Sequence, residues 1–79
     1  MAKVLAVGTF GSESPTHAVI PFLTAQGAIE AGHEPTIVLS GDAVVLMKDE
    51  VAKATVPVGW PPVGQVLAGL IQHQVPIHV

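Results

Sequence analysis

Residues 3–41, KVLAVGTFGSESPTHAVIPFLTAQGAIEAGHEPTIVLSG, decide the fold. Lys3 to Val7 is a short run of aliphatic and β-branched residues that ends at Gly8, which is typical of a strand buried on both faces. Residues 34–41 repeat this pattern, and a helical pattern lies between the two runs. A strand, a helix and a strand within about 40 residues indicate a βαβ unit, which pairs its strands in parallel with a right-handed crossover.

Local signals define the ends of the intervening helix. Ser14 suits the N-cap position and Pro15 suits N1, where its missing N–H costs nothing. The helix is expected to run to about Ala31, with Gly32 in the C′ position that favours glycine. The apolar positions expected to face the core are Ile20, Leu23, Gly27 and Ala31, flanked by Val19, Phe22 and Ala28.

The second half of the chain predicts a further helix and a third strand. Asp42 is expected to cap a short helical turn that reaches Val45 or Met47. Residues 48–62 mix charges with prolines and glycine, and they predict a solvated helix end followed by an irregular loop. A helix is expected from Pro62 to about Gln74. Its core-facing stripe is Val63, Val66, Leu67, Leu70 and Ile71.

Residues 76–79, PIHV, are expected to form a third parallel strand. The predicted fold is α/β, a three-layer α/β/α arrangement with a parallel sheet of which this chain supplies the first three strands. Residues 1–79 are expected to be a single domain that lacks its C-terminal part, or one whose sheet a partner completes. In a doubly wound sheet the third strand lies on the other side of the first strand from the second, so the switch point falls between strands one and three.

Composition limits the kinds of partner. The chain has 79 residues, of which 49% are hydrophobic and only 11% charged, so self-association is expected. Three lysines, no arginine and a formal charge of −3 provide no basic patch for phosphates, so nucleic acid is not an expected partner. There is no cysteine, hence no disulfide, no thiol nucleophile and no thiolate metal ligand.

Membrane and export signals are not recognisable in the sequence. The apolar start MAKVLAVGTF leads into a glycine-containing turn without a small-residue cleavage site. The longest uncharged stretch, residues 54–79, is interrupted by prolines and glutamines, whereas a membrane span needs about 20 mostly apolar residues. A cytoplasmic protein that does not bind membranes is therefore expected.

The motif AGHEPTIVLSGDAVVL, residues 31–46, together with the helix that leads into VPIHV, resembles the DsrE/DsrF-like family, which is related to the sulfur-relay subunits TusD and TusC. The similarity covers nearly all 79 residues. The resemblance implies a sulfur-transfer or related thiol function in the complete form, sulfur-relay partner proteins, and a homo-oligomer, either a trimer or a hexamer. In that family a cysteine that carries a persulfide commonly follows the strand matching Ile77 to Val79. The resemblance thus implies that this chain lacks the nucleophile, and no catalytic residue is assigned to it.

The predicted strand order places a ligand-binding crevice between the carboxyl ends of the first and third strands. The residues expected to line it are Gly8, Thr9, Phe10, Gly11, Ser12, Ser14, His78 and Val79. A thiol placed there would lie near the N-terminus of the first helix, where the helix dipole would lower its pKa. His78 is the histidine expected to tune a group in the crevice.

Several other features admit a plain structural interpretation. The loop GTFGSES, residues 8–14, is either a simple strand-to-helix loop or an anion contact, although Glu13 would repel an anion. His17, His33 and His73 are widely spaced and favour structural roles over a metal site, with His33 expected to stabilise a helix C-terminus by its charge. Trp60 is expected at an interface or in a lid, and Asp49 with Glu50 on a solvated face.

Three functional hypotheses follow. The first is a DsrE/DsrF-like protein whose complete form transfers sulfur. The second is a noncatalytic oligomeric module of the same fold that binds a small ligand or a protein, and the third is a flavodoxin-like nucleotide binder. No cofactor and no metal are expected, and whether the protein is an enzyme is left open.

Overall fold

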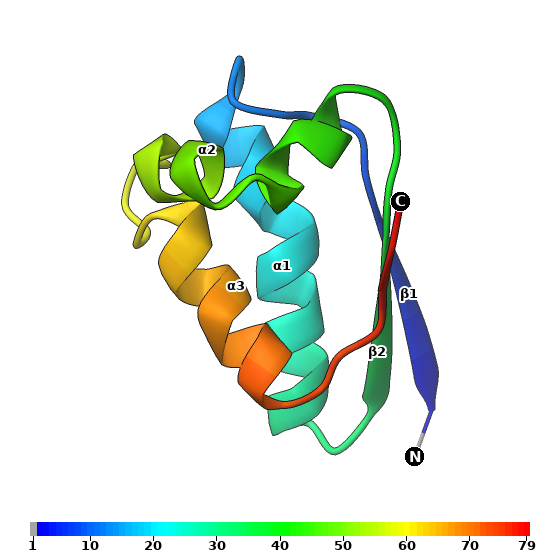
Figure 1. Ribbon diagram of the computed structural model, residues 1–79. Helices are drawn as coiled ribbons and strands as arrows, with labels where there is room; N and C mark the ends of the chain where they lie inside the picture. The colour runs from blue at the N-terminus through cyan, green and yellow to red at the C-terminus, as the bar shows by residue number, and fades with distance from the viewer. Residues whose placement is uncertain (1) are drawn as a thin grey trace.

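A computed structural model describes residues 2–79 and shows a parallel sheet with the helices gathered on one side of it (Figure 1). This confirms the predicted α/β class and the parallel sheet. The elements in chain order are β1 (Lys3–Gly8), α1 (Pro15–Glu30), β2 (Glu34–Leu39), the 3-10 helix η1 (Gly41–Met47), α2 (Asp49–Ala54), α3 (Val63–Gln72) and β3 (Ile77–His78).

The strand order differs from the predicted one. β2 lies in the middle and pairs in parallel with both β1 and β3, so the expected switch point between β1 and β3 does not exist. Right-handed crossovers that continue in one direction across a sheet place their helices on the same face. The contact between α1 and α3 fits this arrangement. A reversal of direction at β1 would have placed the two helices on opposite faces.

The described residues therefore form two layers, and the predicted third layer is not confirmed. Pairing in register puts Leu5 beside Thr36 and Val7 beside Val38, on the face of the sheet that turns away from the helices. Leu5 is 64% exposed and Val7 is 57% exposed. The expectation that the first strand is buried on both faces is wrong, because the helices cover only the face to which Ala6 and Gly8 belong.

α1 has the predicted ends. Ser14 is its N-cap residue and Pro15 its first helical residue, while Gly32 adopts a φ of +83° just past the C-cap. The N–H of His33 donates to the carbonyl oxygen of Ala28, and that of Gly32 to the carbonyl oxygen of Ile29, which is the Schellman pattern.

The buried face of α1 is shifted from the predicted stripe. The residues expected to flank the stripe, Val19, Phe22 and Ala28, are buried, whereas Ile20, Gly27 and Ala31 are exposed. The reason is that α1 packs against both the sheet and α3, so Ala18 and Ala25 also turn inward. Small residues at these two positions admit the close approach of the neighbouring elements.

The core lies between the inner face of the sheet and the helices. Its largest fully buried side chains are Phe22, Ile37, Leu39, Leu46, Leu70, Val19, Val63 and Thr55. α3 presents the predicted stripe to this core except for Ile71, which is 57% exposed. A buried threonine is tolerated because the Thr55 hydroxyl donates to the carbonyl oxygen of Val51 at 2.7 Å.

The segment between β2 and α3 is more helical than predicted. Ser40, and not Asp42, is the N-cap residue of η1, and Asp42 lies inside its first turn. α2 occupies the charged stretch, where Asp49 and Lys53 form an exposed ion pair at 3.0 Å. Within residues 2–79 every helix is either too short or too polar to cross a membrane.

Candidate functional site: a divided crevice and an apolar sheet face

The loop between β1 and α1 is held in place by its own residues. Both carboxylate oxygens of Glu13 accept from the backbone N–H of Gly11, at 2.9 and 3.1 Å. Gly11 is buried against the backbone of Asp42, so closely that a side chain there would collide with it. An anion bound at the Gly11 amide would have to displace a carboxylate, which favours the simple-loop interpretation over an anion contact.

The N-terminus of α1 carries a small cluster of side chains. The Ser14 hydroxyl lies 2.8 Å from Nδ1 of His17 and makes no hydrogen bond to the backbone of the helix. The ring of Phe10 lies against the His17 ring, with 4.8 Å between the ring centroids. The cluster is a local arrangement of residues three and seven positions apart, and it holds the imidazole at the edge of a cavity.

This cavity has a volume of about 250 Å³ and lies between β1 and the first turns of α1. Three of the predicted crevice residues, Gly8, Thr9 and Phe10, contribute to its lining. The remaining lining residues are Ala6, Val7, His17, Ile20, Pro21 and Thr24. His17 was assigned only a structural role from the sequence, because the stack on Phe10 depends on the path of the loop.

The other predicted crevice residues are not part of this cavity. Ser12 lines a separate hollow of about 420 Å³ together with Glu13, Gly41, Asp42 and Val45. His78 and Val79 lie on the other side of β2 from the β1 loop residues, because β2 separates β3 from β1 in the sheet. Two inter-strand spacings amount to roughly 10 Å. The predicted crevice is thus divided, although all three strands end at the same edge of the sheet.

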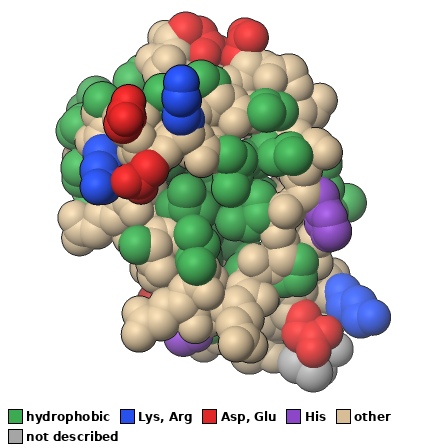
Figure 2. Space-filling view, viewed as in Figure 1, with side chains coloured by type: hydrophobic (Ala, Val, Ile, Leu, Met, Phe, Trp, Pro, Cys, Tyr) green, Lys and Arg blue, Asp and Glu red, His purple; other side chains and the backbone are tan. Residues whose placement is uncertain are grey.

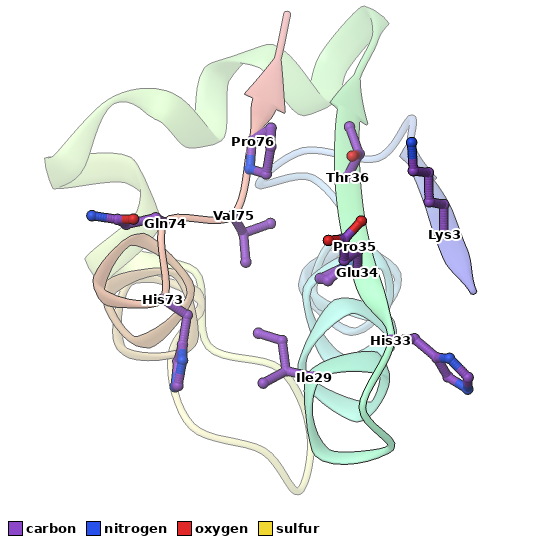
Figure 3. A pocket seen from close by; sticks show the side chains of 10 residues that line it. All are labelled: Lys3, Ile29, His33, Glu34, Pro35, Thr36, His73, Gln74, Val75 and Pro76. Carbon is purple, nitrogen blue, oxygen red and sulfur yellow. The ribbon is translucent and has the colours of Figure 1, made fainter. Parts of the chain in front are cut away.

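A further cavity of about 540 Å³, which was not predicted, lies at the opposite edge of the sheet. In Figure 3, Ile29 and Val75 point toward the interior of this cavity, while His33 and His73 point away on its two sides. It exists because β2 and β3 pair only from Ile37 and Ile77 onward. The signal in the sequence was the pair of prolines near the strand starts, Pro35 and Pro76, since proline cannot donate to a sheet ladder.

His33 does not have the predicted role. Its Nδ1 atom accepts from the backbone N–H of Ala2 at 2.9 Å, which requires that this nitrogen carry no proton. His33 therefore ties the start of β1 to the turn before β2. Its contact is with a backbone donor and not with the carbonyls at the end of α1.

Many large hydrophobic side chains are exposed among the described residues. In Figure 2, hydrophobic side chains gather in the middle of the view, while the acidic and lysine side chains lie mainly toward the periphery. The large hydrophobic residues exposed over the whole described chain are Leu5, Val7, Phe10, Ile20, Val44, Val45, Met47, Val56, Val58, Trp60, Ile71 and Val79.

Within residues 2–79 no group of three or more His, Cys, Asp or Glu side chains is arranged to hold a metal ion. Comparison with models of protein families, with curated proteins and with solved structures finds no match.

Proposed function

We propose that this chain is a noncatalytic oligomeric α/β binding module that associates through the outer face of β1 and β2. The observation that supports this proposal is the exposure of Leu5 and Val7 on an all-parallel sheet. Parallel sheets occur almost only with both faces covered. Val38, beside Val7 in the register, is half-buried and extends the same apolar area into the central strand.

The composition supports association with further copies. With 11% charged residues, the chain has few groups to solvate its surface, and a domain of this size buries only roughly 60% of the surface of its unfolded chain. Covering Leu5 and Val7 would each contribute about 1.5 kcal/mol or more, in the range for burying an aliphatic side chain.

The cavity between β1 and α1 is the place where such a module would hold a small ligand. Its apolar lining, the Phe10 and His17 rings and the Thr9 hydroxyl suit a small molecule with a flat apolar body and one polar group. Val7 belongs both to this cavity and to the outer face of the sheet. Ligand binding and association would therefore affect one another.

A matched pair of substitutions tests the association. Val7→Lys places a charge on the outer face, and Ile71→Lys places the same charge on α3, where the wild-type side chain is also 57% exposed. We expect Val7→Lys to lower the mass of the oligomer in sedimentation equilibrium and Ile71→Lys to leave it unchanged. Equal effects of the two variants, or none from Val7→Lys, would contradict the proposal.

Sulfur transfer is the second candidate, and it applies to a form of the protein that continues past Val79. It is supported by the resemblance and by the parallel direction of β3, whose carboxyl end shares an edge with the β1 loop. A native longer form should carry a cysteine within a few residues of Val79, with a thiol that alkylates well below the ordinary pKa of about 8.5. A thiol that titrates as a free cysteine, or no cysteine at that position, would exclude this candidate.

A further inference from the structure

We infer that the outer face of the sheet binds a second copy of the same face, related by a two-fold axis that runs parallel to the strands between β1 and β2. The inference rests on the proposed function, since it names the partner and the geometry of that association. It is carried by the pairing register of β1 and β2, which fixes the pattern of side chains on this face.

Each outward residue of β1 has an outward neighbour on β2. Lys3 pairs with Glu34, Leu5 with Thr36, and Val7 with Val38. A two-fold axis along the strands turns the face over, keeps the strand direction and exchanges left with right. An axis between β1 and β2 therefore lays β1 of one subunit over β2 of the other.

Under this symmetry every ladder pair is repeated across the interface. Lys3 faces Glu34 of the partner subunit, and Val7 faces Val38 of the partner subunit. Because a two-fold contact is reciprocal, each of these contacts occurs twice. Two sheets stacked in this way lie about 10 Å apart with aligned strands, a distance that lysine and glutamate side chains from the two sides can span.

The charges select this axis among the alternatives. An axis centred on β2 would set Glu34 against Glu34 of the partner subunit, and an axis centred on β1 would set Lys3 against Lys3 of the partner subunit. An axis across the strands would lay the charged end of the face over the opposite end of the partner's face, where the outward residues Val7 and Val38 offer no charge. Only the axis between the strands gives opposite charges at both positions.

A two-fold contact also bears on the oligomeric state implied by the family resemblance. A trimer with only a three-fold axis has no two-fold interface, whereas a dimer and a hexamer built from two trimers do. The inferred contact therefore favours a dimer or a hexamer over an isolated trimer.

Mixing two charge-reversal variants tests the geometry. Lys3→Glu makes both cross-interface pairs acidic, and Glu34→Lys makes both basic. Because like charges then face each other, the dissociation constant of each variant alone should be about tenfold higher than that of wild type at low salt. In a mixture, one subunit of each kind restores both opposite-charge pairs. We expect the mixed dimer to form with a dissociation constant within about threefold of the wild-type value, as complementary charges are regained.

The mixing experiment separates the interface from effects inside one chain. Lys3 and Glu34 are also neighbours within a subunit, and this internal pair remains like-charged in both variants after mixing. Restored association in the mixture can therefore come only from contacts between subunits. Lys48→Glu, an exposed charge reversal near α2, is the control that should leave the dissociation constant unchanged.

The outcomes distinguish the inferred geometry from the proposed function. If Val7→Lys dissociates the oligomer but the mixed variants stay as weak as each one alone, the sheet face is the contact and the two-fold axis between β1 and β2 is wrong. If Val7→Lys leaves the oligomer intact, or the wild-type chain is a monomer, the association through this face is wrong, and the geometry with it.

Discussion

Replacement of Gly11 tests the close contact between the β1–α1 loop and η1. A Cβ there would collide with the carbonyl oxygen of Asp42 and lie 2.9 Å from Cγ1 of Val45, so either the loop or η1 would have to move. We expect Gly11→Ala to lower the free energy of unfolding by about 1–3 kcal/mol, the usual range for overpacking. Urea denaturation followed by circular dichroism measures this change.

Gly27→Ala is the matched control, because a Cβ at Gly27 has no neighbouring atom within 4 Å. Gly27 lies inside α1 and is exposed, so alanine should raise stability by about 0.5–1 kcal/mol through helix propensity. A loss of stability at Gly27, or none at Gly11, would show that the close approach of the loop to η1 is not as the structure has it.

At this scale the sequence predicted the cap residues of α1 correctly, the N-cap of η1 wrongly and the side-chain partners poorly. Ser14 and Gly32 were predictable because helix ends depend on a few adjacent residues. The bond from Ala2 to His33 joins positions 31 residues apart, and the stack of Phe10 on His17 depends on the loop path. Such contacts leave no signal in local sequence.

α2 is the element whose charges should matter least. The ion pair between Asp49 and Lys53 is exposed on both sides, with side-chain exposures of 79% and 72%. Asp49→Ala should therefore change the free energy of unfolding by no more than about 0.5 kcal/mol, as for other exposed i,i+4 pairs. Urea denaturation at low and at high salt would measure this contribution.

Thr55, which follows α2, gives the contrasting case. Its side chain is buried, its hydroxyl donates to Val51, and its carbonyl oxygen accepts from the N–H of Val63 at the start of α3. Thr55→Ala should cost about 1–2 kcal/mol, because it removes a buried hydrogen bond and some packing. A larger loss from Asp49→Ala than from Thr55→Ala would contradict this assignment of the α2 to α3 junction.

The elements themselves were predictable, but their arrangement was not. Hydrophobic period and turn residues located β1, α1, β2 and α3 within a few residues. Strand order depends on whether the chain, after α3, adds β3 beside β2 or beside β1. No periodic pattern in the sequence encodes that choice. This one difference divides the predicted crevice and leaves the outer face of β1 uncovered.

At the scale of the whole molecule, an apolar sheet face and a low charge content both point to association. The interface contact predicted for Trp60 stays a prediction, and it is compatible with the sheet contact because Trp60 lies in the loop between α2 and α3. Trp60 is 43% exposed, and the N–H of Val58 donates to the Thr16 hydroxyl at 3.2 Å, which holds this loop against α1.

The mass of the native particle tests the central claim most directly. Sedimentation equilibrium of the 79-residue chain at micromolar concentration should give at least twice the 8.1 kDa of one subunit. An even number of subunits would agree with the two-fold contact between sheet faces. A single species of 8.1 kDa that stays monomeric across this concentration range, with Leu5 and Val7 exposed, would contradict the account.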